Sequence, residues 1–291
     1  MGESDQQSSS ISDEWLLKNL PFISFYCEND ALYSMRFLSG PDPIFGYDLN
    51  DFLDNKSYFA ASAILPEDLD IMDAHAEQAV AGGRPVVSRI RVATTEGEPV
   101  QLLIASQAVI GEGDQVLGLA GVGIDLRQVP ALQGPPGLLS ELHIPAVPRP
   151  RAKLTGTFDA AWVIEQLPLQ SFLCRNDESF TIVANRGSLE ELLGYPSADF
   201  RGTAANIKPW SVLFPDDQEA SDAYFELAGS GEGQQATARI RLVDKSSNLA
   251  PVLVFAAGAK PPGSDEIMIC GGVLNVSHIP ALQGDFKLLD N

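Results

Sequence analysis

Cysteine and histidine are the side chains of this sequence with the most varied chemistry, and both are scarce. The chain has three cysteines and three histidines in 291 residues. An odd cysteine count without a Cys-x-x-Cys pair predicts neither a disulfide framework nor a structural zinc site. No histidine lies near a Gly-x-Ser-x-Gly or an equivalent nucleophile motif, and no phosphate loop, kinase motif or cyclase motif is present. We therefore expect a non-catalytic chain without a metal site.

Two of the cysteines, Cys27 and Cys174, occupy equivalent positions in two similar stretches of sequence. A redox role would require an exposed thiol with a low pKa. A free cysteine more often behaves as a small buried hydrophobic residue. We favour this structural interpretation for both positions.

Arginines form two alternating pairs, Arg89 with Arg91 and Arg239 with Arg241. Residues two apart on a strand share one face of the sheet, so each pair could clamp a carboxylate. A solvated strand face is the simpler interpretation, and it is the one that we expect.

The sequence segments that contain these residues occur twice in the chain as an internal repeat. Trp15-Leu-Leu-Lys-Asn-Leu-Pro21 is matched by Trp162-Val-Ile-Glu-Gln-Leu-Pro168, an offset of 147 (162 − 15), and Arg89 is matched by Arg239, an offset of 150 (239 − 89). A slowly growing offset indicates a duplicated domain with small loop insertions. The period is too long for a solenoid, whose repeats run about 20–50 residues.

We predict five segments from this duplication. They are a disordered tail (1–11), a first domain (12–134), a proline-rich linker (135–157), a second domain (158–284) and a short tail (285–291). Within each domain, turn, proline and glycine signals predict a short helix, a β-hairpin, several short helices, one longer helix and three further strands. The linker is expected to be a solvated spacer, although its three basic residues against one acid also allow an electrostatic strap.

Charge and hydropathy exclude two classes of protein. The formal net charge is −20, and neither copy offers the basic field that nucleic-acid binding requires. No apolar run approaches the about 18 residues of a membrane span, and the polar N-terminus has no apolar signal core. The sequence therefore predicts an acidic, soluble, cytoplasmic protein.

The element order together with several short motifs resembles the PAS (Per-Arnt-Sim) sensor domain, of the PAS fold-3 type. In the first copy the resembling motifs are Leu20-Pro21, Met35-Arg-Phe-Leu-Ser39, Phe45-Gly-Tyr47, Leu65-Pro-Glu-Asp68, Ser88-Arg-Ile-Arg91 and Gly123-Ile-Asp125-Leu126. The likeness covers 15–127 and 160–276, and the second copy departs more, because its turn at Lys245-Ser-Ser-Asn248 lacks the usual Asp-Gly. The resemblance implies an α+β fold of two PAS domains, each a five-stranded antiparallel sheet with short helices on one face.

PAS domains bind flavin, haem, small acids or apolar metabolites, or no ligand, so the fold alone does not identify a cofactor. The Asn-Cys-Arg-Phe-Leu motif of covalent flavin photochemistry is absent. His75 lies on the predicted long helix about two residues from the position of the haem ligand in the family, which is about 200° around a helix. We expect no cofactor, keep flavin and haem as weaker alternatives, and expect His75 to be a partly exposed helix residue.

Any ligand would lie between the sheet and the helices, among residues that a filled core would also use. The candidate residues are Met35, Phe45, Tyr47, Ile64 and Met72 in the first copy, and Ile182, Leu193, Tyr195, Trp210 and Phe225 in the second. We expect most of them to be plain core. Trp210 and Tyr195 are the best exceptions, because a buried Trp or Tyr requires a polar partner.

Prolines follow the last strand of each copy, at Pro130 after Asp125 and at Pro280 after Asn275. A proline there interrupts the continuous helix through which many PAS sensors drive an output domain. We therefore expect the pair to bind a protein partner, or to form a homodimer, through its sheets or N-terminal helices.

These observations lead to two hypotheses of function. The first is a tandem PAS sensory and regulatory module for signal transduction, which binds a small-molecule ligand or a protein partner and passes the signal on. Its output, such as a histidine kinase or a diguanylate cyclase, would then lie outside this chain. The alternative is a stand-alone scaffold for dimerisation and protein–protein interaction, with filled PAS cores and no ligand.

Overall fold

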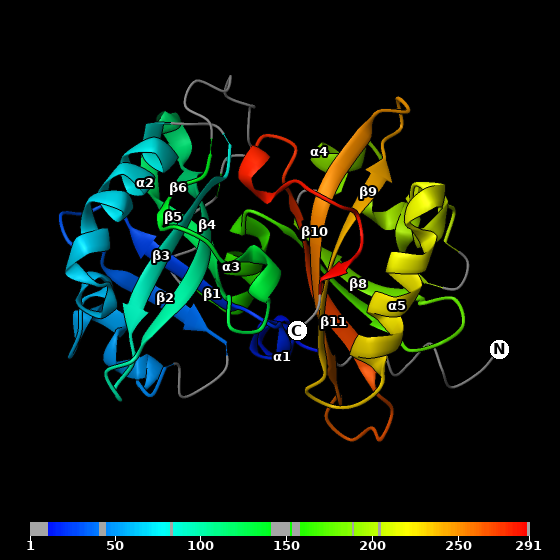
Figure 1. Ribbon diagram of the computed structural model, residues 1–291, viewed down its shortest axis with the longest axis horizontal. Helices are drawn as coiled ribbons and strands as arrows, with labels where there is room; N and C mark the ends of the chain where they lie inside the picture. Colours follow the sequence, from blue (N-terminus) through cyan, green and yellow to red (C-terminus); the bar gives the residue numbers. More distant parts are fainter. Residues whose placement is uncertain are drawn as a thin grey trace. The chain divides into compact units, whose positions relative to one another are not determined.

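The computed structural model describes residues 11–40, 45–81, 84–140, 152, 158–187, 189–202 and 205–289. It divides into two compact units, each built on one antiparallel sheet (Figure 1). The N-sheet unit contains Phe22–Pro168 and His278–Gln283. The C-sheet unit contains helix α1 (Asp13–Asn19), Leu169–Ser277 and the segment that begins at Gly284.

The sheet of the N-sheet unit has the strand order β2-β1-β5-β4-β3-β6. Its strands are β1 (Ile23–Glu28), β2 (Met35–Ser39), β3 (Val86–Ala93), β4 (Pro99–Ile110), β5 (Val116–Asp125) and β6 (Gly137–Leu138). Helix α2 (Leu69–Ala81) packs along β3, β4 and β5. The remaining helices are α3 (Ala160–Gln166) and the short 3-10 helices η3 (Leu49–Asp51), η4 (Leu53–Asn55), η5 (Ala60–Ala63), η6 (Pro66–Asp68), η7 (Glu112–Asp114) and η8 (Pro130–Leu132).

The sheet of the C-sheet unit repeats this order as β8-β7-β11-β10-β9-β12. Its strands are β7 (Gln170–Arg175), β8 (Ile182–Arg186), β9 (Gln235–Val243), β10 (Leu249–Ala259), β11 (Met268–Asn275) and β12 (Leu288–Leu289). Helix α5 (Gln218–Gly229) lies along one face of this sheet (Figure 1). The shorter helices of the second copy are α4 (Leu189–Leu193), η9 (Ser197–Phe200), η10 (Pro209–Val212), η11 (Pro215–Asp217) and η12 (Pro280–Leu282), of which η12 belongs to the N-sheet unit.

The predicted α+β class is confirmed, but the predicted number of strands is wrong, because each sheet has six strands rather than five. The sixth strand is short and lies at an edge. After β5 the chain turns through η8 and returns beside β3, where Leu138 pairs with Ser88. In the second sheet Leu289 pairs with Thr237 of β9 in the same way. Residues Gly137 and Leu138 of the predicted linker therefore belong to a sheet.

Capping side chains and prolines determine the ends of α1 and α3, which are the first helix of each copy. Ser12 caps α1 by accepting a hydrogen bond from the Trp15 amide at 3.1 Å, and Asp159 caps α3 by accepting one from the Trp162 amide at 2.9 Å. Each cap supplies an acceptor to an amide that has no partner within its own helix. The prolines at 21 and 168 prevent either helix from continuing, because the residue before a proline disfavours helical geometry.

Each of these helices lies in the unit built on the sheet of the other copy. In the N-sheet unit, the Tyr26 ring of β1 packs on Phe158 and Trp162, with ring centroids 4.7 and 4.9 Å apart. Gln107 of β4 donates to the Gln166 carbonyl of α3 at 2.7 Å. Both contacts lie on the face of the sheet opposite α2, because Tyr26 and Gln107 alternate with residues that face α2.

In the C-sheet unit, helix α1 makes equivalent contacts with the sheet. The Cys270 thiol of β11 donates to the Asn19 carbonyl at 3.0 Å, and Arg186 of β8 pairs with Asp13 at 3.0 Å. The predicted domains, 12–134 and 158–284, follow the sequence repeat, and those boundaries stay a prediction. The compact units instead exchange the first helix of each copy, α1 and α3, and the N-sheet unit also includes η12 of the second copy.

No helix in the described part of the chain is long and apolar enough to span a bilayer.

Candidate ligand-binding site

Each unit contains a cavity between its sheet and the helices on one face. The cavity of the C-sheet unit has a volume of about 430 Å³, and that of the N-sheet unit about 220 Å³. Small-molecule sites commonly measure about 300–1,000 Å³. The larger cavity is therefore the stronger candidate for a ligand site.

The structure places nine of the ten sequence-predicted ligand residues on these cavities. The N-sheet cavity is lined by Met35, Phe45, Tyr47, Ile64 and Met72, and the C-sheet cavity by Ile182, Leu193, Trp210 and Phe225. Tyr195 does not line either cavity; its ring packs edge-on against Phe200 at 6.1 Å and lies beneath the Lys245 ammonium at 5.9 Å. Ligand binding by these residues stays a prediction.

One substitution between the two copies favours the larger volume of the C-sheet cavity. Ser221 on α5 corresponds to Met72 on α2, at an offset of 149 (221 − 72), and each lines its own cavity. Gln170 similarly corresponds to Ile23, at an offset of 147 (170 − 23). A serine in place of a methionine leaves space that packing does not fill.

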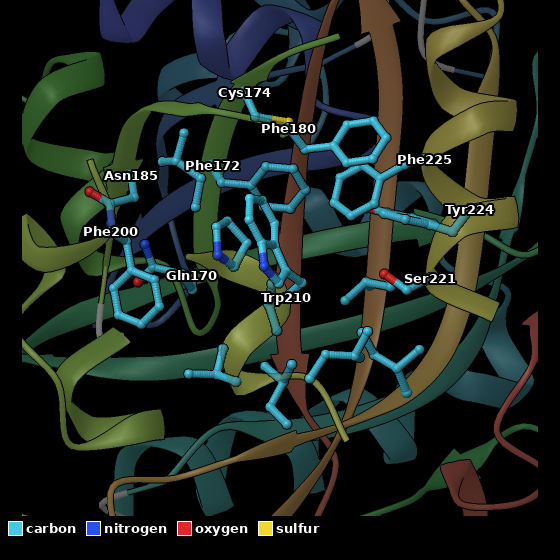
Figure 2. Close-up of a pocket in the computed structure, with 18 of the residues that line it drawn as sticks. Gln170, Phe172, Cys174, Phe180, Asn185, Phe200, Trp210, Ser221, Tyr224 and Phe225 are labelled. Carbon is cyan, nitrogen blue, oxygen red and sulfur yellow. The ribbon is translucent and has the colours of Figure 1, made fainter. Parts of the chain in front are cut away.

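Six aromatic residues line the C-sheet cavity together with aliphatic side chains (Figure 2). They are Phe172, Phe180, Phe200, Trp210, Tyr224 and Phe225. The Phe180 and Phe225 rings stack with centroids 4.2 Å apart and planes 17° apart. Trp210 is 43 % exposed, so it does not require the buried polar partner that we expected of it, and it lies where the cavity opens to solvent.

Two polar atoms in this wall are buried and have no hydrogen-bond partner. Tyr224 is 1 % exposed and its hydroxyl is unpaired, and Gln170 is 4 % exposed with its Oε1 unpaired. The Gln170 amide nitrogen is already committed to the Ser171 carbonyl at 3.1 Å. Burial raises the pKa of Tyr224 well above its ordinary value, so the phenol is protonated at neutral pH. An unpaired polar atom in an apolar wall is unusual in a folded protein and favours a bound partner.

Neither Gln170 nor Tyr224 was among the sequence-predicted site residues. A comparison of the two copies could have found Tyr224. The equivalent residue is His75, whose ring nitrogens hydrogen-bond with Ser88 Oγ at 2.8 Å and Ser106 Oγ at 2.6 Å. In the second copy both serines are replaced, by Ala238 and Ala256. The polar partners were therefore lost together with the histidine.

His75 itself is 1 % exposed, so the prediction of a partly exposed helix residue is wrong. Desolvation by burial lowers the pKa of His75 to about 4, and the imidazole is neutral at physiological pH. Both of its nitrogens have partners on β3 and β4. Binding a haem iron would require His75 to give up one of these bonds.

The described residues that line the C-sheet cavity include no Lys, Arg or His. Its charged members are Glu178 and Asp222, both exposed. An anionic group such as a phosphate or a haem propionate would therefore lack a cation in this cavity and would meet carboxylates at its rim.

The cysteines are buried, as the structural interpretation predicted for Cys27 and Cys174. Burial raises the pKa of the Cys27 and Cys270 thiols to about 12 and that of Cys174 well above its ordinary value. They are protonated thiols, which are poor nucleophiles and poor metal ligands. Within the described residues, no cluster of His, Cys, Asp and Glu could hold a metal ion.

The expected solvated arginine face is wrong, because all four arginines have partners within the protein. Arg91 donates to the buried Asp68 carboxylate, with Nε at 3.0 Å and Nη2 at 2.6 Å, and its amide donates to the same group at 2.7 Å. Arg241 and Asp217 repeat this arrangement. Asp68 and Asp217 lie directly before the long helices α2 and α5. Arg91 and Arg241 therefore stabilise the fold by holding the start of each long helix against the sheet.

Arg89 and Arg239 are buried and donate to main-chain carbonyls after the last long strand. Arg89 Nη1 donates to Pro135 at 3.1 Å, and Arg239 Nη1 donates to Asp285 at 3.0 Å. Burial lowers the pKa of both guanidinium groups. The two arginines hold the chain segments that lead into the edge strands β6 and β12.

No family model and no curated protein matches the chain. Among solved structures it is similar to an RNA-binding light-oxygen-voltage receptor, at 16% identity over 88% of this chain and 96% of that one, with a TM-score of 0.33. It is also similar to the PAS-B domain of Cycle from Drosophila melanogaster, at 14% identity over 37% of this chain and 98% of that one, with a TM-score of 0.32. A PAS domain from Colwellia psychrerythraea gives 14% identity over 43% of this chain and 97% of that one, with a TM-score of 0.33.

The strand order provides independent information on the fold. In each unit the five long strands follow the order second, first, fifth, fourth, third of their copy, and the long helix covers one face. Five long antiparallel strands with helices across one face, present twice, match the arrangement that the sequence resemblance implied, and a short sixth strand is added at one edge of each sheet. The two antiparallel sheets thus fit a tandem PAS domain protein.

Proposed function

We propose that this chain is a non-catalytic tandem sensory and regulatory module whose C-sheet unit binds a small ligand. The observation that carries the proposal is the cavity of about 430 Å³ in which Tyr224 and Gln170 each leave a buried polar atom unpaired. A buried polar atom without a partner costs about 1–3 kcal/mol of folding stability. A ligand that supplies the missing partners recovers this free energy and stabilises one state of the unit.

The N-sheet unit acts as a scaffold in this proposal. Its cavity is smaller, Met72 occupies the place of Ser221, and its buried histidine already has two partners. These features support the alternative that we drew from the sequence, a filled PAS core for protein contact, for this one unit.

The signal passes to a protein partner or to a second copy of the chain. After β5 the chain forms η8 and then the edge strand β6, and after β11 it forms η12 and then β12. In the described residues no long helix leaves either sheet at this point. This arrangement supports an output through surface contacts rather than through a rotating helix.

Native mass spectrometry of the purified protein, with an absorption spectrum of the same sample, tests the ligand. We expect mass above that of the bare chain, released by denaturation. Ser221→Met, which introduces the residue of the first copy, should abolish this extra mass by filling the cavity. Glu219→Met, an exposed position on the same helix, is the matched control and should retain it.

A bare chain mass for the wild type, together with a melting temperature that no compound of a metabolite library raises, would contradict ligand binding. The same screen on Ser221→Met identifies compounds that act elsewhere, because a ligand of the C-sheet cavity should stabilise only the wild type and the control.

A further inference from the structure

We infer that the ligand of the C-sheet cavity is an uncharged, flat aromatic molecule with a hydrogen-bond donor for Gln170 at one end and an acceptor for Tyr224 at the other. This inference rests on the proposed function, since it names the class of ligand for the same cavity. Three properties of the cavity lead to it: the aromatic rings that line it, its two unpaired polar atoms and its charge.

The shape of the ligand follows from the aromatic rings. Figure 2 shows Gln170 and Tyr224 on opposite sides of the cavity, with Phe172 and Trp210 between them. Phe180 and Phe225 form a stacked pair beside this space. Aromatic side chains contact flat rings by stacking or edge-to-face packing. An aromatic ligand thus makes the largest contact with this wall.

The donor and acceptor of the ligand follow from the two unpaired atoms. Gln170 Nε2 donates to the Ser171 carbonyl, and the unpaired Oε1 is an amide oxygen that can only accept, so the ligand must donate to it. The Tyr224 hydroxyl is free to donate, and the ligand must offer an acceptor. Both side chains are more than nine-tenths buried.

The neutrality of the ligand follows from the charges of the cavity. Among the described lining residues the carboxylates of Glu178 and Asp222 are exposed, and no cationic side chain is present. A buried anion would be unpaired and would meet a carboxylate at the rim, and a buried cation would lose its hydration in the apolar interior. A neutral molecule avoids both costs.

A matched pair of probes tests the inference. 6-Hydroxy-2-naphthamide is neutral, flat and aromatic, with a hydroxyl donor at one end and an amide carbonyl acceptor at the other, and 6-hydroxy-2-naphthoate has nearly the same shape but carries a negative charge. Isothermal titration calorimetry with the full chain should show that the amide binds at least about tenfold more tightly than the carboxylate.

Two variants locate the binding in the C-sheet cavity. Tyr224→Phe removes only the unpaired hydroxyl. Gln170→Ile introduces the residue of the first copy and removes one hydrogen bond of the protein, the bond to the Ser171 carbonyl. Each should weaken 6-hydroxy-2-naphthamide binding about tenfold. Tyr58→Phe, at a partly exposed tyrosine outside both cavities, should leave it unchanged.

Each result decides the inference. Equal binding of the two probes, or unchanged binding of 6-hydroxy-2-naphthamide to Tyr224→Phe, overturns it. Failure of both probes also overturns the aromatic class. The proposed function is judged separately by the extra mass on the wild-type protein and its loss in Ser221→Met, so a ligand of another class would be recognised as such.

Discussion

The buried thiols provide the most direct test at the scale of the residue. Cys27, Cys174 and Cys270 are buried, and desolvation raises the pKa of each of them. A thiolate is the reactive form, so we expect no modification by iodoacetamide in the folded protein at pH 8. Mass spectrometry of the intact chain measures this, with the urea-unfolded protein as the control. Rapid labelling of any of the three in the folded protein would contradict the burial and the pKa shift together.

His75 predicts a dependence of stability on pH. Its pKa is lowered from 6.5 to about 4 by desolvation, so the unfolded chain binds this proton at a higher pH than the folded protein does. The contribution to the free energy of unfolding is fully present above pH 6.5 and is lost as the pH falls towards 4. The loss should be about 3 kcal/mol, measured by urea denaturation at intervals of pH.

Other groups titrate in the same range, so a matched variant is needed to isolate the histidine. His75→Gln keeps an amide that can hydrogen-bond with Ser88 and Ser106 but does not titrate. The difference in unfolding free energy between this variant and the wild type should shrink as the pH falls from 6.5 to 4. A constant difference across that interval would mean that His75 is not held neutral in the folded protein.

The residue scale is also where prediction from the sequence was weakest. The candidate ligand residues were chosen as large apolar side chains, and nine of them do line the cavities. The polar members, Gln170 and Tyr224, were missed because a single glutamine or tyrosine carries no periodic signal. Only the pairing of β3 with β4 shows that Ser88 and Ser106 both meet His75, and that the equivalent positions have become alanine.

At the scale of the element, a buried carboxylate holds the start of each long helix. Asp68 lies at the end of η6 and accepts hydrogen bonds from the amide and the guanidinium group of Arg91 on β3. The Arg91 side chain is about one-third exposed and can be hydrated, so removal of Asp68 mainly leaves the Arg91 amide without its acceptor, which costs about 1–3 kcal/mol. We expect Asp68→Ala to lower the free energy of unfolding by about that amount, and Asp217→Ala to act alike in the C-sheet unit.

The control for this prediction is Glu67→Ala, which removes the exposed acidic neighbour from the same turn. Its effect should be less than about 0.5 kcal/mol. The Arg91 guanidinium also holds the pKa of Asp68 below its ordinary value, so this contribution is present above about pH 4 and is lost as the pH falls below it. Equal effects of the two variants would show that the buried pair does not hold the helix to the sheet.

The elements were predicted well where a strong local signal exists. Prolines at 21, 66, 168 and 215 and the repeated turn residues gave the helices and the long strands. The edge strands β6 and β12 were not predicted, because a strand of two residues has no alternation to detect. Their position depends on Arg89 and Arg239 deep in the sheet, which hold the incoming chain by its carbonyls.

At the scale of the whole molecule, the exchange of the N-terminal helices could not be predicted from the sequence. The same local residues form α1 and α3 whichever sheet they cover, because caps and prolines fix only the ends of a helix. The choice is made by partners far away in the chain, namely Tyr26 and Gln107 for α3, and Cys270 and Arg186 for α1. Each copy therefore completes the unit built on the sheet of the other.

This exchange predicts that the two copies stay together without a covalent connection. The test is to express residues 1–150 and 151–291 as two chains, with an affinity tag on the first. They should purify as a one-to-one complex, because each sheet needs the helix of the other chain to cover the face that carries Tyr26 or Cys270.

Deleting 11–21 from the first chain and 158–168 from the second removes both helices and should abolish the complex. Deleting 285–289 instead removes β12 alone and should preserve it. Halves that elute as separate, folded monomers would show that each sheet can take back its own helix, and that the copies are independent domains.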